Sequence, residues 1–272
     1  MRQDRPDASG KTDRRPEGST ADPLGRAMLA HHRGESGRLL YRDGSDVRDG
    51  TVADFYFSSP ESWDRETTAV LERLADHEPI LDVGCGAGKH LLWWAARDVA
   101  AVGVDVSPNA VRTARERGVD AGRLFVADMF DLPFVADSFG AVHAVGTQVG
   151  LGRSLAGIHE LLWEFARVTG EDGVAVVDNY DPREGTDDLL GHRPDPRQGI
   201  AHRCFHLEFV DERIDGERRR EVGRTLQFLL CSPDRLREAT AGTPWRVADV
   251  LRADGSAHYR AVLEPVGTTT RE

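Results

Sequence analysis

Cysteine and long apolar stretches are scarce in this sequence. Its 272 residues include only three cysteines, too few for a disulfide framework, which favours a reducing, cytoplasmic location. No apolar run approaches the ~18 residues that a membrane-spanning helix needs, so no membrane segment is expected. The first 22 residues are polar and charged, unlike a secretory signal.

Lysine is nearly absent. Of the 35 basic residues only Lys11 and Lys89 are lysines, and 46 acidic residues bring the net charge to −11. A negative surface repels a phosphate backbone, so nucleic acid is not an expected partner. The bias toward arginine and acidic residues has two readings that the sequence leaves open, a salt-loving source or a GC-rich genome.

The composition and its changes along the chain indicate one main folded domain. Hydrophobic residues make up 39% of the chain and charged residues 30%, as in ordinary globular proteins. Residues 1–22 lack periodicity and are expected to form a disordered tail. The rest divides into an N-terminal cap segment at 23–58 and a main domain at 59–267, which carries an insertion at 181–230.

Apolar runs typical of buried strands alternate with amphipathic helical patterns through most of the main domain. Strands are expected at 79–83, 99–106, 123–127, 139–145 and 173–179. Helices are expected at 60–75, 90–97, 108–117 and 155–168. This order predicts an α/β fold with a doubly wound, mostly parallel sheet.

The two ends of this pattern carry further elements. The cap segment reads as a short helix at 24–32 and a strand at 38–42. The insertion reads as two strands, at 201–210 and 219–230, around a turn at 215–216. A helix from 233 to 241 and a closing hairpin of strands at 245–251 and 258–264 end the domain.

A glycine-rich loop follows the first strand. Residues 82–88 read Asp-Val-Gly-Cys-Gly-Ala-Gly, and glycines let a backbone turn sharply and approach a ligand closely. Ligands of open α/β sheets bind at the carboxyl ends of the strands, where this loop lies. Lys89 stands where a dinucleotide fingerprint has its third glycine, which argues against NAD.

Residues 80–88 resemble motif I of the class I S-adenosylmethionine-dependent methyltransferases. Four later blocks resemble the family's further motifs in the same order, namely 102–108, 127–134, 137–142 and 164–173. The resemblance covers about residues 60–265. The chain is similar to the type 11/25-like bacterial and archaeal members of the family. It implies a Rossmann-like seven-stranded sheet with an antiparallel last strand and a small β insertion after the fifth strand.

The resemblance implies S-adenosyl-L-methionine as cofactor and S-adenosyl-L-homocysteine as product. In the family, the glycine loop packs on the methionyl part, and an acid after the second strand accepts the ribose hydroxyls. Carried onto this sequence, the methionyl site comprises Asp82, Gly84, Cys85, Gly86 and Gly88. Asp105 would bind the ribose, and Val106, Asp128 and Met129 the adenine. Gly146 and Thr147 would line the reacting centre.

The sequence identifies the methyl acceptor and a catalytic base less directly than it identifies the cofactor. Tyr180 and Asp181, at the end of the fifth strand, are candidate catalytic residues, and Tyr56, Gln148, His202 and His206 are candidate substrate contacts. His202, Cys204 and His206 alternate along a strand and share one face, but no fourth ligand stands out, so no metal is expected.

Methyl transfer from an activated cofactor needs mainly alignment of the acceptor. Residues 146–149 read Gly-Thr-Gln-Val and lack an Asn/Asp-Pro-Pro-Tyr type motif, which favours a small-molecule acceptor. Two other readings stay open, a non-catalytic cofactor-binding protein on the same fold and an NAD-dependent oxidoreductase. The sequence does not predict the oligomeric state.

Overall fold

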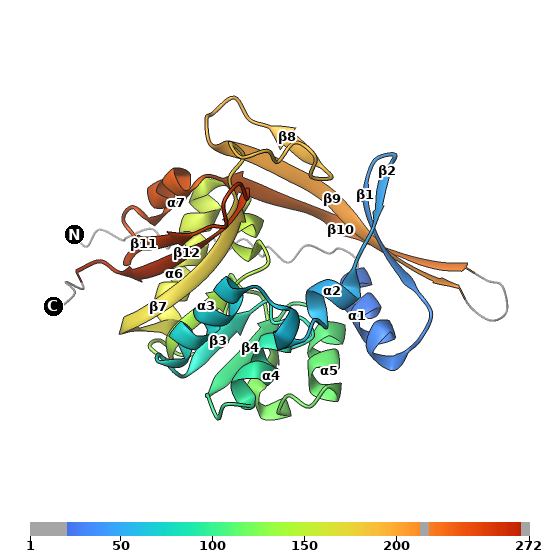
Figure 1. Cartoon of the computed structure of the whole chain (residues 1–272), viewed down its shortest axis with the longest axis horizontal. Helices are drawn as coiled ribbons and strands as arrows, with labels where there is room; N and C mark the ends of the chain where they lie inside the picture. Colours follow the sequence, from blue (N-terminus) through green and yellow to red (C-terminus); the bar gives the residue numbers. More distant parts are fainter. Residues whose placement is uncertain (1–20, 213–217, 268–272) are drawn as a thin grey trace, which may run out of the picture.

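A computed structural model describes residues 21–212 and 218–267 as two β-sheets with flanking helices (Figure 1). Residues 1–20 of the expected tail at 1–22, and the expected turn at 215–216, lie outside these residues. In the described parts of the chain, no helix has the length and apolar character to cross a membrane.

The larger sheet has seven strands. Its order is β11-β12-β7-β6-β3-β4-β5. The bounds are β3 (Ile80–Val83), β4 (Ala101–Asp105), β5 (Leu124–Val126), β6 (Phe139–Ala144), β7 (Thr169–Tyr180), β11 (Trp245–Leu251) and β12 (His258–Pro265). The strands β3 to β7 pair in parallel, and β12 pairs antiparallel with both β7 and β11. The predicted doubly wound sheet with an antiparallel last strand is confirmed.

Helices cover both faces of this sheet. The first face carries α3 (Arg65–Ala75), α4 (Lys89–Ala95) and α5 (Pro108–Glu116), and the second carries α6 (Leu155–Val168) and α7 (Pro233–Thr240). Leu71 and Trp94 are fully buried on the first face and Leu161 on the second. Each such leucine stabilises the fold by about 1.5–3 kcal/mol relative to an exposed one. Short 3₁₀ turns lie at Pro60–Ser62, Ala121–Arg123 and, labelled η3, at Gln148–Gly152.

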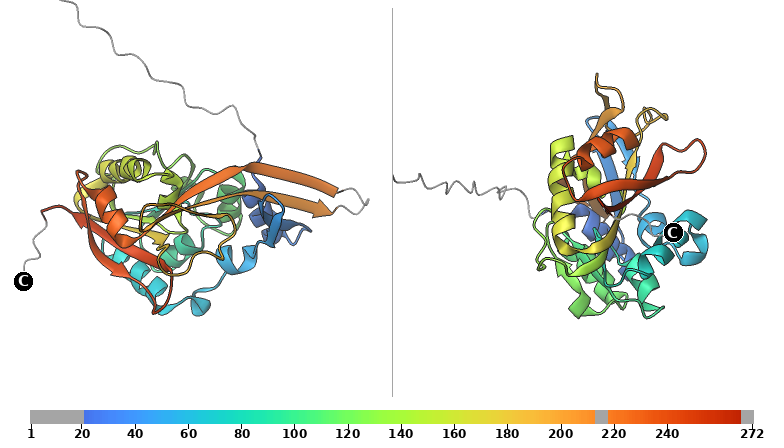
Figure 2. Two further views of the ribbon diagram at one scale, coloured as in Figure 1. Left: turned by 90° about the horizontal axis from the view of Figure 1, so that it is seen from above. Right: turned by 90° about the vertical axis from the view of Figure 1, so that its left-hand side faces the viewer.

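A second, antiparallel sheet, which we call the roof sheet, joins the cap segment to the insertion. Its order is β10-β9-β1-β2, with β8 paired to β9. The bounds are β1 (Arg38–Asp43), β2 (Asp46–Asp49), β8 (His192–Pro194), β9 (Ile200–Glu212) and β10 (Arg218–Cys231). Seen from above in Figure 2, the long β9–β10 pair reaches from the central sheet to the N-terminal helices.

Several elements differ from the sequence-based expectation. The strands β2 and β8 were not expected: all four side chains of β2 are exposed, so no apolar alternation marks it, and β8 has only three residues. The helix α2 (Val52–Tyr56) buries no residue and was also missed. The strand β7 starts at Thr169, directly after α6, rather than at 173.

Asp22 fixes the N-terminal helix α1 (Pro23–Arg33) to the main domain. Its carboxylate accepts the N–H of Gly25 at 3.0 Å and so caps α1. The same carboxylate accepts the Ser107 hydroxyl at 2.6 Å and the Asn109 side-chain amide at 2.9 Å, both at the start of α5. Asp22 was expected in the disordered tail, but the structure shows it as the cap that docks α1.

Glu208 ties three strands of the roof sheet together. It lies on β9 with its side chain fully buried, and it binds Arg42 of β1 (2.8 Å) and Arg220 of β10. His206 contacts the same carboxylate oxygen at 2.9 Å. Burial raises the pKa of Glu208, but the hydrogen bonds from Arg220, His206 and Arg42 outweigh it and lower the pKa to about 2. The ionised carboxylate therefore stabilises the folded roof.

We expect the Glu208→Gln substitution to lower the free energy of unfolding at pH 7 by about 1.5–3 kcal/mol, because charge-assisted bonds are lost. The folded-state pKa lies below the ordinary value of 4.5, so this stabilisation is present above pH 4.5 and is lost as the pH falls toward 2. Urea unfolding at pH 7 and pH 3 measures both. A variant with the same acid sensitivity as the wild type would contradict this role.

Candidate functional site

A cavity of about 380 Å³ lies between the carboxyl ends of the parallel strands and the roof sheet. Its floor comes from the ends of β3, β4, β5 and β6 and includes Gly84, Asp105, Asp128 and Thr147. Its roof comes from β1, β9 and β10 and includes Tyr41, Arg203, Phe205 and Phe228. The N-terminal segment closes one side with Asp22, Leu24, Met28 and Tyr56.

The glycine loop forms part of the floor. Gly84, Gly86 and Gly88 have φ angles of +72°, +54° and +74°, which L side chains rarely adopt. A Cβ on Gly84 would lie 2.5 Å from Nε2 of Gln148, and one on Gly86 would lie 3.0 Å from the Tyr56 ring. The loop therefore lets Gln148 and Tyr56 approach its backbone.

Asp105, at the end of β4, holds the glycine loop in place. Its Oδ2 accepts the N–H of Gly86 at 2.9 Å, and its Oδ1 accepts the N–H of Ser107 at 2.8 Å. Burial raises its pKa to about 6, against the lowering effect of these two bonds, and the nearby charges of Asp22 and Asp82 raise it further. A carboxylate can accept about four hydrogen bonds, so Asp105 retains acceptor capacity at the cavity wall.

The loop after β6 depends on another carboxylate. Asp178 of β7, which is 2% exposed, accepts the N–H of Gly146 at 2.9 Å and that of Thr147 at 2.5 Å. His258 Nε2 lies 2.8 Å from the same carboxylate. Gly146 (φ +108°) and Thr147 (φ +63°) both have left-handed backbone, which is costly for a threonine. The hydrogen bonds of Asp178 hold this conformation and so position Gln148 over Gly84.

The part of the floor that follows β4 and β5 carries apolar side chains and one carboxylate. The side chain of Val106 is 61% exposed although it lines the cavity. Asp128 uses one carboxylate oxygen to accept the N–H of Phe130 at 3.1 Å, and Met129 lines the cavity beside it. This end therefore offers an apolar face next to a hydrogen-bond acceptor.

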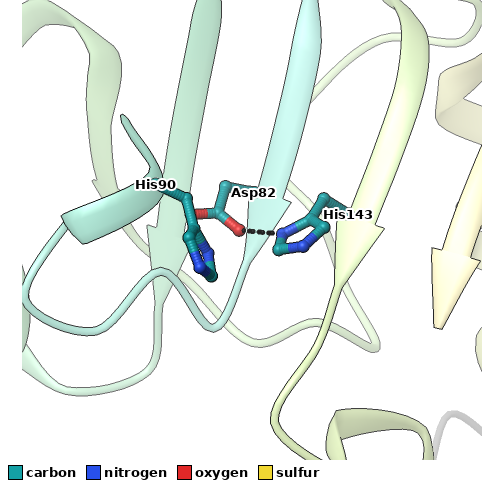
Figure 3. A group of neighbouring side chains, drawn as sticks. All are labelled: Asp82, His90 and His143. Carbon is teal, nitrogen blue, oxygen red and sulfur yellow. Dashed lines mark hydrogen bonds and ion pairs between the residues drawn. The ribbon is translucent and has the colours of Figure 1, made fainter. Parts of the chain in front are cut away.

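Asp82 is not among the residues that line the cavity. Its side chain points toward His143, with His90 beside it, as Figure 3 shows. It is 3% exposed, and its Oδ1 lies 2.7 Å from Nδ1 of His143. Among the described residues, its Oδ2 and Nε2 of nearby His90 have no hydrogen-bond partner. One ligand atom from each of the three lies within 4.8 Å of the others, so they could hold a metal ion. The expected absence of a metal stays a prediction.

Three other predicted cofactor contacts of the glycine loop, Cys85, Gly86 and Gly88, do not line the cavity. Cys85 is buried against β4, where a Cβ on Gly103 would meet its Sγ at 2.9 Å. Burial raises the pKa of its thiol well above the usual value, so it is not a reactive thiolate at neutral pH. Gly88 instead lets α4 approach Ala114 of α5, 2.9 Å from where its Cβ would be.

The candidate catalytic residues also lie outside the cavity lining. Tyr180 packs against the His258 ring at a centroid distance of 5.2 Å. Asp181 is fully buried and binds Arg183 at 2.9 Å and Arg252 at 3.0 Å. Burial raises the pKa of Asp181, but the bonds from these arginines outweigh it and keep the pKa below its ordinary value. Asp181 therefore forms structural ion pairs with the two arginines, and its lowered pKa makes it a poor base.

His202 and His206 lie on the face of β9 that turns away from the cavity. His202 contacts Asp195 at 3.2 Å, and His206 contacts Glu208. The cavity is lined by the alternate residues Arg203, Phe205 and Leu207, because successive side chains of a strand point to opposite faces. The geometry does not support the two histidines as substrate contacts.

Sequence reasoning missed the roof residues. The residues of β9 that line the cavity include Arg203, Phe205 and Leu207. Phe205 and Leu207 are buried. The alternation of apolar with polar residues along β9 indicates which face of the strand is turned inward. The metal-ligand residue types at 202, 204 and 206 instead favoured the opposite face as the functional one. Tyr41 and the cavity arginines Arg153 and Arg224 carry no comparable local pattern.

Comparisons with known proteins agree with this architecture. Residues 80–173 match a family model described as a methyltransferase domain. The methyltransferase GfsG of Streptomyces halstedii is 33% identical over 138 residues, 47% of this chain and 48% of that protein. The tRNA (carboxymethyluridine(34)-5-O)-methyltransferase alkbh8 of Xenopus tropicalis is 36% identical over 104 residues, 36% of this chain and 15% of that protein. The chain thus spans about half or less of these relatives.

Solved structures share the fold over most of the chain. The crystal structure of a SAM-dependent methyltransferase from Bacteroides fragilis in complex with S-adenosyl-L-homocysteine has a TM-score of 0.70 and 19% sequence identity, covering 90% of this chain and 95% of that one. The domain match and the shared fold confirm the resemblance that the sequence motifs indicated.

We expect Asp178→Ala to destabilise the protein by about 2–4 kcal/mol, because it leaves two backbone N–H groups of the 146–147 loop unpaired. Hydrogen exchange of residues 146–148 should also become faster. The control is Asp234→Ala, which removes exposed ion pairs to Arg183 and Arg237 and should cost less than about 1 kcal/mol. Equal urea midpoints for the two variants would show that Asp178 does not hold the loop.

Proposed function

We propose that this chain, whose residues 80–173 match a methyltransferase domain, is a class I S-adenosylmethionine-dependent enzyme that transfers a methyl group to a small-molecule acceptor. The observation that carries the proposal is the position and the hydrogen bonding of Asp105. This residue lies at the carboxyl end of β4, retains acceptor capacity, and anchors the glycine loop at the floor of the cavity.

The residues present fit S-adenosyl-L-methionine. The glycine loop leaves its backbone free of side chains beside Gln148 and Tyr56. Asp105 can accept two ribose hydroxyls in addition to the bonds from Gly86 and Ser107. Val106 presents an exposed apolar face for the adenine ring. The cavity volume of about 380 Å³ lies within the range of small-molecule sites.

We assign the other cofactor contacts by their place on the floor. Asp128 and Met129 would bind the adenine edge, and Gly84, Gly146 and Thr147 would border the methionyl part. Gly86, Gly88 and Cys85 shape the loop rather than touch the ligand. Asp82 is a positioning residue, because its carboxylate joins the ends of β3 and β6 through His143.

When bound, the cofactor supplies a methyl group that its sulfonium already activates. The residues of this chain bind, orient and exclude water. Asp105 would hold the ribose end, and Gln148, which lies at Gly84, would border the methyl-donating end. Arg117, which caps the C-terminal end of α5, donates to the carbonyls of Tyr56 (3.2 Å) and Ala87 (2.6 Å), which holds α2 against the glycine loop. Tyr56 and the roof sheet thus cover the cavity.

A small molecule is the proposed acceptor class. The roof sheet and the N-terminal segment cover the cavity from two sides, which favours a compact acceptor over a polymer. The net charge of −11 also disfavours nucleic acid.

The product would be S-adenosyl-L-homocysteine. The three cysteines are free, which supports a cytoplasmic location.

Calorimetric titration with S-adenosyl-L-methionine, S-adenosyl-L-homocysteine and NAD tests the cofactor. We expect micromolar binding of the first two and none of NAD. Asp105→Asn should weaken both by about 10- to 150-fold, because loss of a charge-assisted hydrogen bond costs about 1.5–3 kcal/mol. The exposed Asp254→Ala variant is the control. A folded wild type that binds neither ligand, in low or high salt, would refute the proposal.

The affinity should also depend on pH. The free Asp105 carboxyl has a pKa of about 6, and ribose hydroxyls favour its ionised form, so binding lowers that pKa. Affinity should therefore be constant above pH 7 and fall about tenfold between pH 7 and pH 5. Titrations at pH 5, 6 and 7 measure this change. The Asp105→Asn variant should lose the dependence; retention of it would assign the titration to another group.

A further inference from the structure

Three arginines line the cavity without a carboxylate partner. They are Arg153, Arg203 and Arg224, and none forms an ion pair within residues 21–212 and 218–267. Other arginines do pair, as Arg183 and Arg252 do with Asp181. In a chain with a net charge of −11, acidic side chains are plentiful, so cations without a partner inside one cavity point to a ligand that supplies the negative charge.

Arg203 is the best placed of the three. It lies on β9 with its guanidinium stacked over the Phe205 ring, 4.5 Å from the centroid. Its Nε donates to the Leu190 carbonyl at 2.9 Å, which fixes the side chain and leaves the terminal N–H groups available. Burial lowers its pKa, but a guanidinium stays charged at neutral pH. A desolvated cation is costly unless an anion pairs with it.

Irregular backbone brings the other two arginines to the cavity. The β9–β10 pairing shifts register between Val222 and Thr225, and this bulge contains Arg224. Arg153 ends η3 in a left-handed conformation with φ +64°. Bulges and strained residues occur preferentially beside functional sites. Both features therefore agree with a ligand at the roof side of the cavity.

The charges of the cavity are separated. The acidic residues Asp22, Asp105 and Asp128 belong to its floor and side, whereas Arg203 and Arg224 belong to the roof. The roof also carries apolar and aromatic side chains, namely Tyr41, Phe205, Leu207, Leu226 and Phe228. An anionic group would be repelled from the floor and attracted to the roof, where an apolar body could pack beside it.

We infer that the roof side of the cavity is an oxyanion subsite, in which Arg203 binds a carboxylate or phosphate group of an acceptor with an aromatic or apolar body. This inference rests on the proposed function, since it names the acceptor class of the same cavity. Arg203 presents its terminal N–H groups as a fork that matches two oxygens of the anion, and Arg153 and Arg224 add positive charge around it.

The test uses the full chain saturated with S-adenosyl-L-homocysteine. Calorimetry measures the binding of 3-phenylpropanoate, phenyl phosphate and the neutral 3-phenylpropanamide. Both anions should bind at least about tenfold more tightly than the amide. Their ratio tells carboxylate from phosphate. Arg203→Met should abolish this preference, and Arg203→Lys should retain part of it. The control is Arg237→Met, at an exposed position of α7, which should behave as wild type.

Three results would overturn the inference. The first is equal binding of anions and amide to the wild type, including no binding of any. The second is an undiminished anion preference in Arg203→Met. The third is loss of S-adenosyl-L-homocysteine affinity in Arg203→Met with the acceptor preference unchanged, which would assign Arg203 to the cofactor carboxylate. Failure of the wild type to bind the cofactor would instead refute the proposed function, and the same titrations without cofactor would still test Arg203.

Discussion

Carboxylates hold the loops at the carboxyl edge of the parallel sheet. Backbone N–H groups in these loops have no strand partner, and a buried unpaired N–H is costly. Asp105 accepts two of them from the glycine loop and the start of α5, and Asp178 accepts two from the loop after β6. Asp22 does the same where α1 meets α5. The glycine loop, the loop after β6 and the docking of α1 depend on these bonds.

This way of holding loops also sets the electrostatics of the cavity. Acids that satisfy backbone donors bring negative charge to the floor, which suits a cofactor with a cationic sulfonium and an amino group. The cavity side of the roof sheet has the opposite sign, because it is lined by Arg203 and Arg224, whereas the buried carboxylate of Glu208 is on the outer face and binds Arg42 and Arg220. Arg203 is left on the inner face without a carboxylate partner, so the cavity has a negative floor and a positive roof.

The sequence predicted the central sheet better than the roof sheet. Period-2 and period-3.6 patterns and the glycine loop are local signals, and they located the central sheet and its ligand edge. The roof sheet depends on β1 pairing with β9, a long-range contact that no local pattern encodes. Asp82 lies on the face of β3 shared with Ile80, toward α4, and side-chain direction in so short a strand is not readable from residue type. The family match at 80–173 likewise omits β1, β9 and β10.

The pairing of β1 with β9 has a consequence for how the protein is made. Arg38 pairs with Val210, about 170 residues later, so β1 has no β9 partner until most of the chain has been synthesised. At roughly 5–20 residues per second, the wait is on the order of 10–30 s. During that time apolar residues such as Leu39 have no roof sheet to pack in. The nascent N-terminal segment is therefore a place where chaperones would bind while the central sheet folds.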